Sequence, residues 1–492
     1  MRISPSEIPA QHMAFGVEPS CAAGAQSGEV PARERSDGIP KPLDDLRRHL
    51  IGTEELVPTI GGGLVRYVNA DNAATTPAMW AAWHAVEALV PHHSSVHRGS
   101  GYKARVCTRA YEEARRVVGE FVGADPERDT VVFTKNTTEA INTLASDIEL
   151  PDGAVVLTTV LEHHSNDLPW RARARTLHVG AGSDGSLDLD HLDALLARHA
   201  GRVALLVVTG ASNVTGVVQP VHEHARRVHA VGGRILVDAA QLAAHRPVDL
   251  LPHDDPGHLD FVALSGHKLY APFGSGALIG RRDAFALAPR GRGGGTVTAV
   301  SLDDVAWADL PDREEAGTPN LFGAVAFAAA AATLRAIGWD RVMVHESALL
   351  ETAMNALLEL PRVRVYGPTG TRDPASKVPV LPFNVEGVDH ALVAAVLGFE
   401  HGIGVRSGCF CAQPYVAHLL GLDPVVVRTR LEAARRGARQ VGPGMVRVSL
   451  GLGNGLDDVE RIVTAVGRIA DGRIIGRYRR DERGEYQPAV DD

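Results

Sequence analysis

The sequence predicts an α/β fold in which helices cover both faces of a largely parallel sheet. From about residue 65 to 320, short runs rich in Val, Leu and Ile alternate with helical stretches, as in repeated strand–helix–strand units. Each run is apolar along its whole length, which indicates a strand buried on both faces. After residue 320, a long helical stretch is followed by strands and helices typical of a smaller α+β domain.

The individual elements follow this pattern along the chain. The strands expected in the first part are DTVVFTK, GAVVLTTV, RVALLVVTG, RILVDAA and FVALSG, with helices such as TRAYEEARRVVGEFVG and DLDHLDALLARHAG between them. In the second part, LFGAVAFAAAAATLRAIGW predicts a long helix, and VRVYGP, VLPFNVEG, GIGVRSG and GMVRVSLG predict strands. The Arg-rich segment VVVRTRLEAARRGARQVGPG predicts a helix with a solvated basic face, followed by a turn.

A chain of 492 residues is long enough for two domains. We expect residues 65–320 to form the larger domain, and residues 41–64 and 321–478 to form the smaller one. Residues 1–40 are rich in Pro, Ser, Gly and Glu, which predicts a disordered extension. The charged residues 479–492 predict a flexible tail.

Composition narrows the class of protein. A net charge of −9 over this length argues against a nucleic-acid-binding surface. No segment has the long apolar run of a membrane helix, and the N-terminus lacks the apolar region of a signal peptide. The 4 cysteines are too few and too scattered for a disulfide framework. We therefore expect a cytoplasmic protein without a nucleic-acid or membrane partner.

A single lysine, Lys268, follows the buried strand FVALSG. A lysine at such a place either extends its amine to water or serves a function, since burying an unpaired ammonium group is costly. In parallel sheets, ligands collect at the carboxyl ends of strands. Asp238 and Thr138 also follow strand ends, so the three side chains are expected at one edge of the sheet.

Together these residues match the needs of a pyridoxal phosphate site. A lysine forms the Schiff base, and a carboxylate such as Asp238 keeps the pyridinium nitrogen protonated. Thr137 and Thr138 stand where a strand meets a helix, in N-cap position, and a helix N-terminus binds phosphate. The segment LEHHSNDLPW adds His163 and Trp170, whose flat rings can pack on the cofactor.

The chain resembles the class V, fold-type I family of pyridoxal phosphate enzymes, and within it the group II cysteine desulfurases and selenocysteine lyases. The resemblance spans residues 65–460 and rests on motifs in family order: DNAATTP, SSVHRG, NTTEAIN, LEHHSNDLPW, SNVTG, VDAAQ, SGHKLYAPFGSG, GGGT, EAGTPN, VRSGCFCAQP and VRVSLG. It implies a large domain with a mostly parallel seven-stranded sheet, pyridoxal 5'-phosphate as the cofactor, and a homodimer with shared active sites.

The resemblance also implies roles for individual residues. Lys268 would hold the cofactor covalently and later move protons, Asp238 would pair with the pyridinium nitrogen, and His163 would stack on the ring. The other cofactor contacts would come from Thr137, Thr138, Ser265 and His267 near the phosphate, Gln241 at the phenolic oxygen, Asn213 beside the substrate, and Thr296 from a second subunit.

On the substrate side, Arg447 would bind the α-carboxylate of L-cysteine or a related amino acid, which suits a bidentate guanidinium. Arg406, His97 and Arg98 also match family positions near the substrate. By resemblance, Cys411 would attack the substrate sulfur, release alanine and carry a persulfide to an acceptor protein. The charge of Arg406 would favour the thiolate form of Cys411.

The residues before Cys411 depart from the usual desulfurase motif. Two histidines are common there, whereas this chain has Cys409 and Phe410, as in the desulfurase-like domain of molybdenum cofactor sulfurases. Cys409 is a second relay thiol, a disulfide partner of Cys411 or a packing residue. A zinc site of these cysteines with paired histidines fits the usual spacing poorly, so no metal is expected.

Three functions are compatible with the sequence. The first is a cysteine desulfurase, with selenocysteine lyase as a variant. The second is an aminotransferase, epimerase or C–S lyase of the same family, which would need Lys268 and Asp238 but no cysteine nucleophile. The third is a scaffold that has lost activity, and the intact set of Lys268, Asp238, Gln241 and His163 argues against it.

Overall fold

The computed structural model describes residues 43–182, 184–370, 373, 375–437, 442–481 and 484–489. The N-terminal extension expected over residues 1–40 lies outside this part of the chain.

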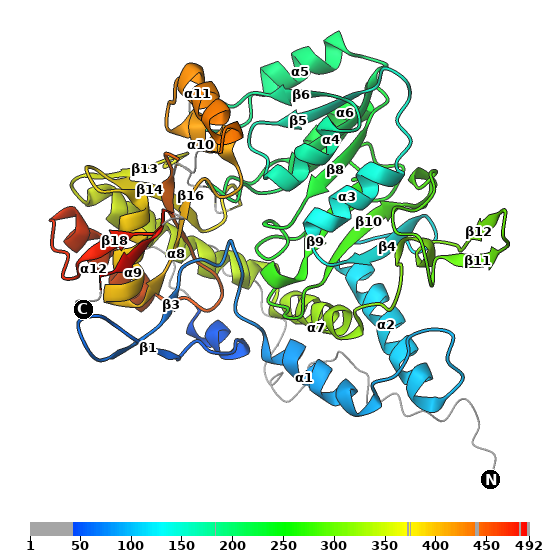
Figure 1. Cartoon of the computed structure of the whole chain (residues 1–492), viewed down its shortest axis with the longest axis horizontal. Helices are drawn as coiled ribbons and strands as arrows, with labels where there is room; N and C mark the ends of the chain where they lie inside the picture. The colour runs from blue at the N-terminus through cyan, green and yellow to red at the C-terminus, as the bar shows by residue number, and fades with distance from the viewer. Residues whose placement is uncertain are drawn as a thin grey trace, which may run out of the picture.

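The larger sheet has seven strands in the order β4-β10-β9-β8-β7-β5-β6 (Figure 1). Every strand runs in the same direction except β10, which is antiparallel to both of its neighbours, β9 and β4. The connection from β9 to β10 is too short for a crossover helix, so the chain returns antiparallel. The strands are β4 (Asp129–Thr134), β5 (Val155–Thr159), β6 (Arg175–Val179), β7 (Val203–Thr209), β8 (Arg234–Asp238), β9 (Phe261–Ser265) and β10 (Gly276–Arg281). The predicted mostly parallel seven-stranded sheet is confirmed.

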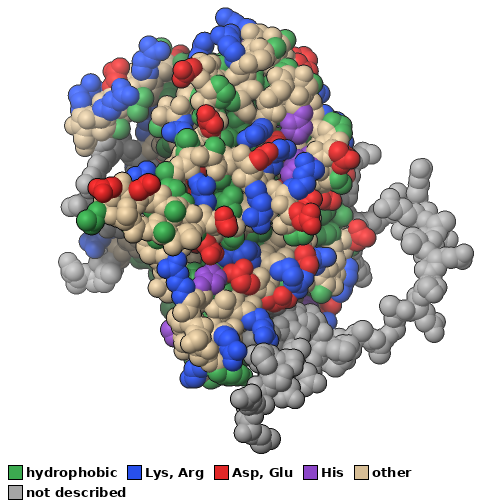
Figure 2. Space-filling view, turned by 90° about the vertical axis from the view of Figure 1, so that its right-hand side faces the viewer, with side chains coloured by type: hydrophobic (Ala, Val, Ile, Leu, Met, Phe, Trp, Pro, Cys, Tyr) green, Lys and Arg blue, Asp and Glu red, His purple; other side chains and the backbone are tan. Residues whose placement is uncertain are grey.

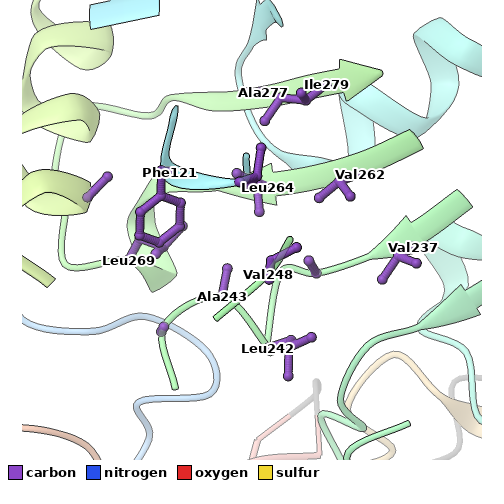
Figure 3. Packing of buried hydrophobic residues seen from close by; sticks show 14 of the residues in the cluster. Phe121, Val237, Leu242, Ala243, Val248, Val262, Leu264, Leu269, Ala277 and Ile279 are labelled. Carbon is purple, nitrogen blue, oxygen red and sulfur yellow. The ribbon is translucent and has the colours of Figure 1, made fainter. Parts of the chain in front are cut away.

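Both faces of this sheet are buried, as the apolar runs predicted. In β9, Val262 and Leu264 belong to one apolar cluster, whereas Phe261 and Ala263 belong to another. Successive strand residues point to opposite faces, so the two clusters lie on the two sides of the sheet. Figure 3 shows the first cluster, in which Val262 and Leu264 lie near Ala277 and Ile279 of β10. The helices of this part are α1 (Trp80–Leu89), α2 (Tyr102–Phe121), α3 (Thr137–Asp147), α4 (Leu168–Arg171), α5 (Leu189–Arg198), α6 (Val221–His229) and α7 (Leu321–Ile337).

The smaller part is built on a four-stranded antiparallel sheet in the order β13-β14-β17-β16. An apolar cluster of its own joins this sheet to helices α8, α9 and α12. The strands are β13 (Val363–Val365), β14 (Val380–Val385), β16 (Arg406–Gly408) and β17 (Met445–Ser449), and the helices are α8 (Trp339–Glu359), α9 (His390–His401), α10 (Gln413–Leu419), α11 (Pro424–Arg435) and α12 (Leu456–Ala470). Helix α11 corresponds to the predicted Arg-rich helix, and none of its residues is buried.

Short strand pairs complete the fold. In order along the chain they are β1 (Leu56–Pro58) with β2 (Leu64–Arg66), β3 (Val68–Asn69) with β15 (Ile403–Gly404), β11 (Val297–Val300) with β12 (Val305–Trp307), and β18 (Tyr478–Arg480) with β19 (Tyr486–Pro488).

The apolar clusters differ from the expected domain limits at two places, and the division into two domains stays a proposal. Helix α7 was expected in the smaller domain, but its apolar residues join the cluster of the large sheet and it packs on α1 and α2. Conversely, Val68 and Ala70 join the smaller cluster, because β3 pairs with β15. Where a flexible tail was expected from residue 479, β18 and β19 form a hairpin, and the Tyr478 hydroxyl donates to Glu400.

No single helix in the described ranges is long and apolar enough to cross a membrane; helices α7 and α8 reach that length and composition only together, bent by 83°. On the face shown in Figure 2, Lys and Arg side chains are interspersed with Asp and Glu.

Candidate active site

A pocket of about 350 Å³ lies where the carboxyl ends of the large-sheet strands meet the smaller sheet. Most of the predicted site residues line it: Thr137, Thr138, His163, Asn213, Asp238, Gln241, Ser265, His267, Lys268, Arg406, Cys411 and Arg447. Eight residues that the sequence did not single out complete the lining: Ala73, Ala74, Asn136, Ser165, Thr209, Ala211, Ala240 and Phe410.

One end of the pocket is the start of helix α3. Asn136 is the N-cap residue, and its side chain accepts a hydrogen bond from Glu139 N at 3.0 Å. The threonines expected at the cap therefore lie in the first turn, because Asn136 competes better for that position. Thr138 Oγ1 lies 2.7 Å from Ser165 Oγ, and Thr137 N donates to Ser265 Oγ at 2.8 Å. Hydroxyls and the positive end of a helix converge here, which suits a phosphate group.

The floor of the pocket carries an acid and an amine. Asp238 ends β8 and is buried, with Oδ1 accepting from Ala240 N at 3.0 Å. Burial raises the pKa of the Asp238 carboxyl, against the opposing effect of Lys268. Burial likewise lowers the pKa of the Lys268 amine, and Asp238 counteracts this. The amine forms no hydrogen bond or ion pair with the described residues, so it is available for a covalent bond.

Two neutral imidazoles border this floor. Burial, followed by the charge of Lys268, lowers the pKa of both His163 and His267 to about 4. His163 Nδ1 accepts from Ser165 N at 3.2 Å, so its ring proton lies on Nε2. His163 thus presents a flat, uncharged ring to the pocket, as stacking on an aromatic cofactor requires.

Gln241 is held by a buried line of polar side chains. Its Nε2 lies 3.2 Å from His245 Nε2, and His245 Nδ1 lies 2.6 Å from Glu346 Oε1. Arg246 Nη1 donates to the other oxygen of Glu346 at 2.8 Å. The line joins the pocket to helix α8. Gln241 Oε1 is buried without a partner among the residues described.

The substrate side holds two arginines that share one carboxylate. Arg406 and Arg447 are opposite each other on β16 and β17, so their side chains lie together. Arg447 Nη2 donates to Asp71 Oδ1 at 2.8 Å, and Arg406 Nη2 lies 3.0 Å from Asp71 Oδ2. The Arg447 guanidinium is buried, whereas the Arg406 side chain is 54% exposed. Arg406 therefore pairs with Asp71, and its predicted effect on the Cys411 thiol stays a prediction.

Arg447 has further contacts that fix its plane. Nη1 donates to Asn213 O at 2.9 Å, and the guanidinium lies 4.9 Å from the centre of the Phe410 ring. Its Nε is buried and has no partner in the described part of the chain. Burial lowers the pKa of Arg447, which favours pairing with an anion.

Cys411 lies on a strained turn at the mouth of the pocket. Phe410 and Cys411 both have φ of +53°, a left-handed conformation that is rare for residues other than Gly. Two hydrogen bonds hold the turn, from Asn213 Nδ2 to Phe410 O at 2.8 Å and from His164 N to Cys411 O at 2.7 Å. Cys411 is exposed, whereas Cys409 is half-buried and burial raises the pKa of its thiol. Cys411 is thus the accessible thiol of the pair.

Four residues that the sequence predicted at the site do not line this pocket: His97, Arg98, Trp170 and Thr296. His97 Nε2 lies 2.9 Å from Glu112 Oε1, and Thr296 Oγ1 donates to Gly293 O at 2.8 Å. Arg98 reaches the carbonyl oxygens next to Thr296, at 3.4 Å from Gly295 and 3.3 Å from Val297. Trp170 is fully buried in the core. Within the described ranges, the groups with metal-ligand spacing do not include Cys409 or Cys411.

Of the site residues that the sequence did not predict, Asn136 has a recognisable local pattern and Asp71 has none. Asn136 stands three residues before Glu139, as N-cap residues often do. Asp71 opens the motif DNAATTP, but its contact with Arg447 joins residues far apart in the chain, which no local pattern shows.

The chain is similar to known proteins in sequence and in fold. Residues 68–462 match the family model described as aminotransferase class-V. A cysteine desulfurase of Haloferax volcanii is 38% identical over 70% of this chain and 81% of its own length, and one of Dickeya dadantii is 36% identical over 77% and 85%. The solved cysteine desulfurase of Thermococcus onnurineus superposes with a TM-score of 0.74 and 31% identity over 88% of this chain and 99% of its own.

Proposed function

The chain belongs to the aminotransferase class-V family, and from that membership we propose the reaction that its pocket carries out. The chain is a cysteine desulfurase, as its relatives are. L-Cysteine and an enzyme thiol give L-alanine and an enzyme persulfide, whose outer sulfur passes to an acceptor. We assign pyridoxal 5'-phosphate as the cofactor and Cys411 as the thiol.

The pocket fits pyridoxal phosphate in several independent ways. The start of α3, with Thr138 and Ser265, suits the phosphate group, and the neutral ring of His163 suits the pyridine face. Asp238 and Lys268, which would meet the pyridine nitrogen and the aldehyde carbon, have pKa values displaced toward their uncharged forms. When bound, pyridoxal phosphate supplies an aromatic ring that withdraws the electron pair left at the substrate carbon.

The remaining residues bind the substrate and move protons. Lys268 Nζ would hold the cofactor covalently, and its amine, freed by the substrate, would take the proton from the substrate α-carbon. Burial favours this role, since it lowers the pKa of Lys268 and so favours the base form. Arg447 would bind the α-carboxylate of the substrate through its guanidinium, and Asn213 would hold that guanidinium in place.

Cys411 would perform the sulfur transfer. Its thiolate attacks the substrate sulfur, an S–S bond forms, and the C–S bond breaks. The electron pair of that bond stays with the carbon skeleton, which takes up protons and leaves as alanine. The balance is one L-cysteine plus one Cys411 thiol to one L-alanine plus one Cys411 persulfide. The exposure of Cys411 supports delivery of that persulfide to an outside acceptor.

One observation carries the proposal: Lys268, Asp238, Arg447 and Cys411 line a single pocket. The test is incubation with L-cysteine, measuring alanine and protein-bound persulfide. Cys411→Ser is expected to abolish persulfide formation and keep the yellow absorbance of the bound cofactor, whereas Cys409→Ser serves as the matched control. Cysteine turnover by Cys411→Ser at the wild-type rate would contradict the role of Cys411.

The same assay separates the other family reactions. Retained turnover of selenocysteine by Cys411→Ser would indicate a selenocysteine lyase, because selenolate leaves without a thiol nucleophile. An aminotransferase would convert the cofactor to its amine form with some amino acid and would not need Cys411.

We also propose that the protein is a cytoplasmic homodimer. Thr296 and Arg98 lie together outside their own pocket, and the adjacent hairpin β11–β12 projects from the large domain (Figure 1). This arrangement agrees with Thr296 contributing to the cofactor site of a second subunit. A monomeric mass for the active protein in solution would contradict it.

A further inference from the structure

A second group of ionisable side chains lies at the other edge of the large sheet, where its parallel strands begin. Asp129 is the first residue of β4, and His253 and His258 belong to the connection that precedes β9. One potential ligand atom from each side chain lies within 4.8 Å of those of the other two. The two imidazole rings are in tilted contact, with centroids 4.1 Å apart and planes inclined by 31°.

The three side chains are almost inaccessible to solvent. The side chains of His253 and Asp129 are 3% and 1% exposed, and His258 is 2% exposed. The only ion-pair partner of Asp129 in the described part of the chain is His253, so no Lys or Arg there balances the carboxylate within ion-pair distance. Asp129 Oδ2 also accepts a hydrogen bond from Asp125 N at 2.9 Å.

The hydrogen bonds fix where the imidazole protons are. His258 Nδ1 lies 2.8 Å from the Leu251 carbonyl, which can only accept, so Nε2 of His258 carries a lone pair. That Nε2 is buried and has no partner among the described residues. His253 Nε2 faces Asp129 Oδ1 at 2.9 Å, and His253 Nδ1 is buried and likewise lacks a partner there.

A carboxyl group and two imidazoles, each with a buried ring nitrogen that lacks a partner among the described residues, are thus gathered where water hardly reaches. Both oxygens of Asp129 have a hydrogen-bond partner, but His258 Nε2 and His253 Nδ1 have none among the described residues, and a buried polar atom without a partner is costly. A divalent cation beside the carboxylate would give the imidazoles a partner for their lone pairs, and two imidazole nitrogens with one carboxylate oxygen are typical ligands of zinc. We propose that Asp129, His253 and His258 bind a divalent cation of the zinc class.

The position of the site indicates what the cation does. It would join the connection between β8 and β9 to the start of β4, and Leu251 in that connection has φ of +59°. The pocket lies at the opposite ends of these strands and shares no lining residue with the group. The cation would therefore stabilise the fold without contacting substrate, and this inference is independent of the proposed reaction.

The test uses the full chain with Cys411→Ser, which removes the exposed thiol from competition for metal. The protein is treated with a chelator, loaded with Zn²⁺, desalted and measured for bound zinc by mass spectrometry; Co²⁺ loading adds an absorption spectrum. We expect one retained equivalent, the visible bands of cobalt with histidine ligands in a tetrahedral site, and a higher melting temperature with Zn²⁺. His258→Gln and Asp129→Asn should weaken binding by about 100-fold or more, since even partners outside the ligand shell change affinity about 10- to 100-fold.

His229→Gln is the matched control. His229 Nε2 also faces a carboxylate, Asp260 Oδ2 at 2.8 Å, but within the described ranges the pair has no third side chain at metal-ligand spacing. Zinc retention should be unchanged in His229→Gln. The proposal is overturned if the parent protein retains no zinc, or if His258→Gln retains as much as the parent. Should His258→Gln fail to fold, the cobalt spectrum of the parent decides, and a spectrum of hydrated Co²⁺ alone overturns the proposal.

Discussion

The wall of the pocket that comes from the large domain consists of side chains at the ends of regular elements, whereas the wall from the smaller domain is a short strand and a strained turn. Asp238 and Lys268 follow two neighbouring parallel strands, and Thr138 lies in the first turn of a helix. Across from them, Phe410 and Cys411 hold left-handed backbone conformations.

The two walls also differ in how open they are. On the first wall Asp238 and Ser265 are buried and Thr138 is exposed, whereas on the second wall Arg447 is buried but the reactive Cys411 and its neighbour Arg406 are exposed. A buried, hydrogen-bonded wall suits a group that stays bound through many reaction cycles. An exposed wall with a reactive thiol suits groups that enter and leave. Substitutions on each wall therefore test whether one wall binds the cofactor and the other binds the groups that enter and leave.

The largest effect is expected on the buried wall, from Asp238→Asn. The amide has the same shape but no negative charge, so it cannot keep a pyridinium nitrogen protonated. We expect kcat to fall by about 10²- to 10³-fold, as for loss of other preorganised electrostatic partners. Turnover of L-cysteine and the absorbance of the bound cofactor measure this. Asp249→Asn changes an exposed residue in the β8–β9 connection and is the control. An equal loss of kcat in this control would contradict a specific role of the Asp238 charge.

On the other wall, the two arginines should behave unequally. Arg447→Gln removes a buried charged hydrogen bond, worth about 1.5–3 kcal/mol, so kcat/KM should fall roughly 10- to 150-fold, mainly through KM. Arg406→Gln, the adjacent residue on β16, removes a largely exposed charge and should change kcat/KM by less than about fivefold. Steady-state kinetics with L-cysteine measures both variants. Equal effects would show that the substrate carboxylate is shared between them.

A smaller effect is expected from Glu346→Gln, which lies behind the buried wall. The amide is neutral and no longer fixes the Nδ1 proton of His245, so Gln241 loses its fixed orientation. We expect about a tenfold loss of cofactor affinity and a shift in the pH dependence of the cofactor absorbance. Spectroscopic titration of the apoprotein measures both. If only the melting temperature changes, Glu346 has no part in orienting Gln241.

The smallest effect concerns stability and pH. The pKa of His267 is about 4 in the folded chain and 6.5 in its ordinary range. Between these values the unfolded chain binds a proton that the folded chain does not, so stability falls as pH drops from 6.5 to 4 and levels off below 4. In His267→Asn this loss is absent. Melting temperatures of wild type and variant should converge or cross over that interval, and a constant difference would contradict the shifted pKa.

Local sequence patterns predicted the residues of the pocket wall from the large domain, but they did not predict the wall from the smaller domain. Parallel strands end at one edge of a sheet, so Asp238, Lys268 and Thr138 could be placed together before the structure was known. The opposite wall depends on Arg447 meeting Asp71 across 376 residues of chain, and only the family resemblance pointed to Arg447. Neighbouring residues also compete for the N-cap position of α3, which Asn136 occupies in place of the predicted Thr137. The assignments of His97, Arg98 and Thr296 stay predictions.

The carboxylate of Asp71 has a consequence for how the protein selects its ligands. It already occupies both arginines, so an incoming amino acid exchanges one anion for another instead of meeting an unmatched cation. Affinity is then set by the difference between two similar ion pairs, and simple salts gain little by entering. Only a molecule that also offers an amine and a sulfur atom to the other residues has a net advantage.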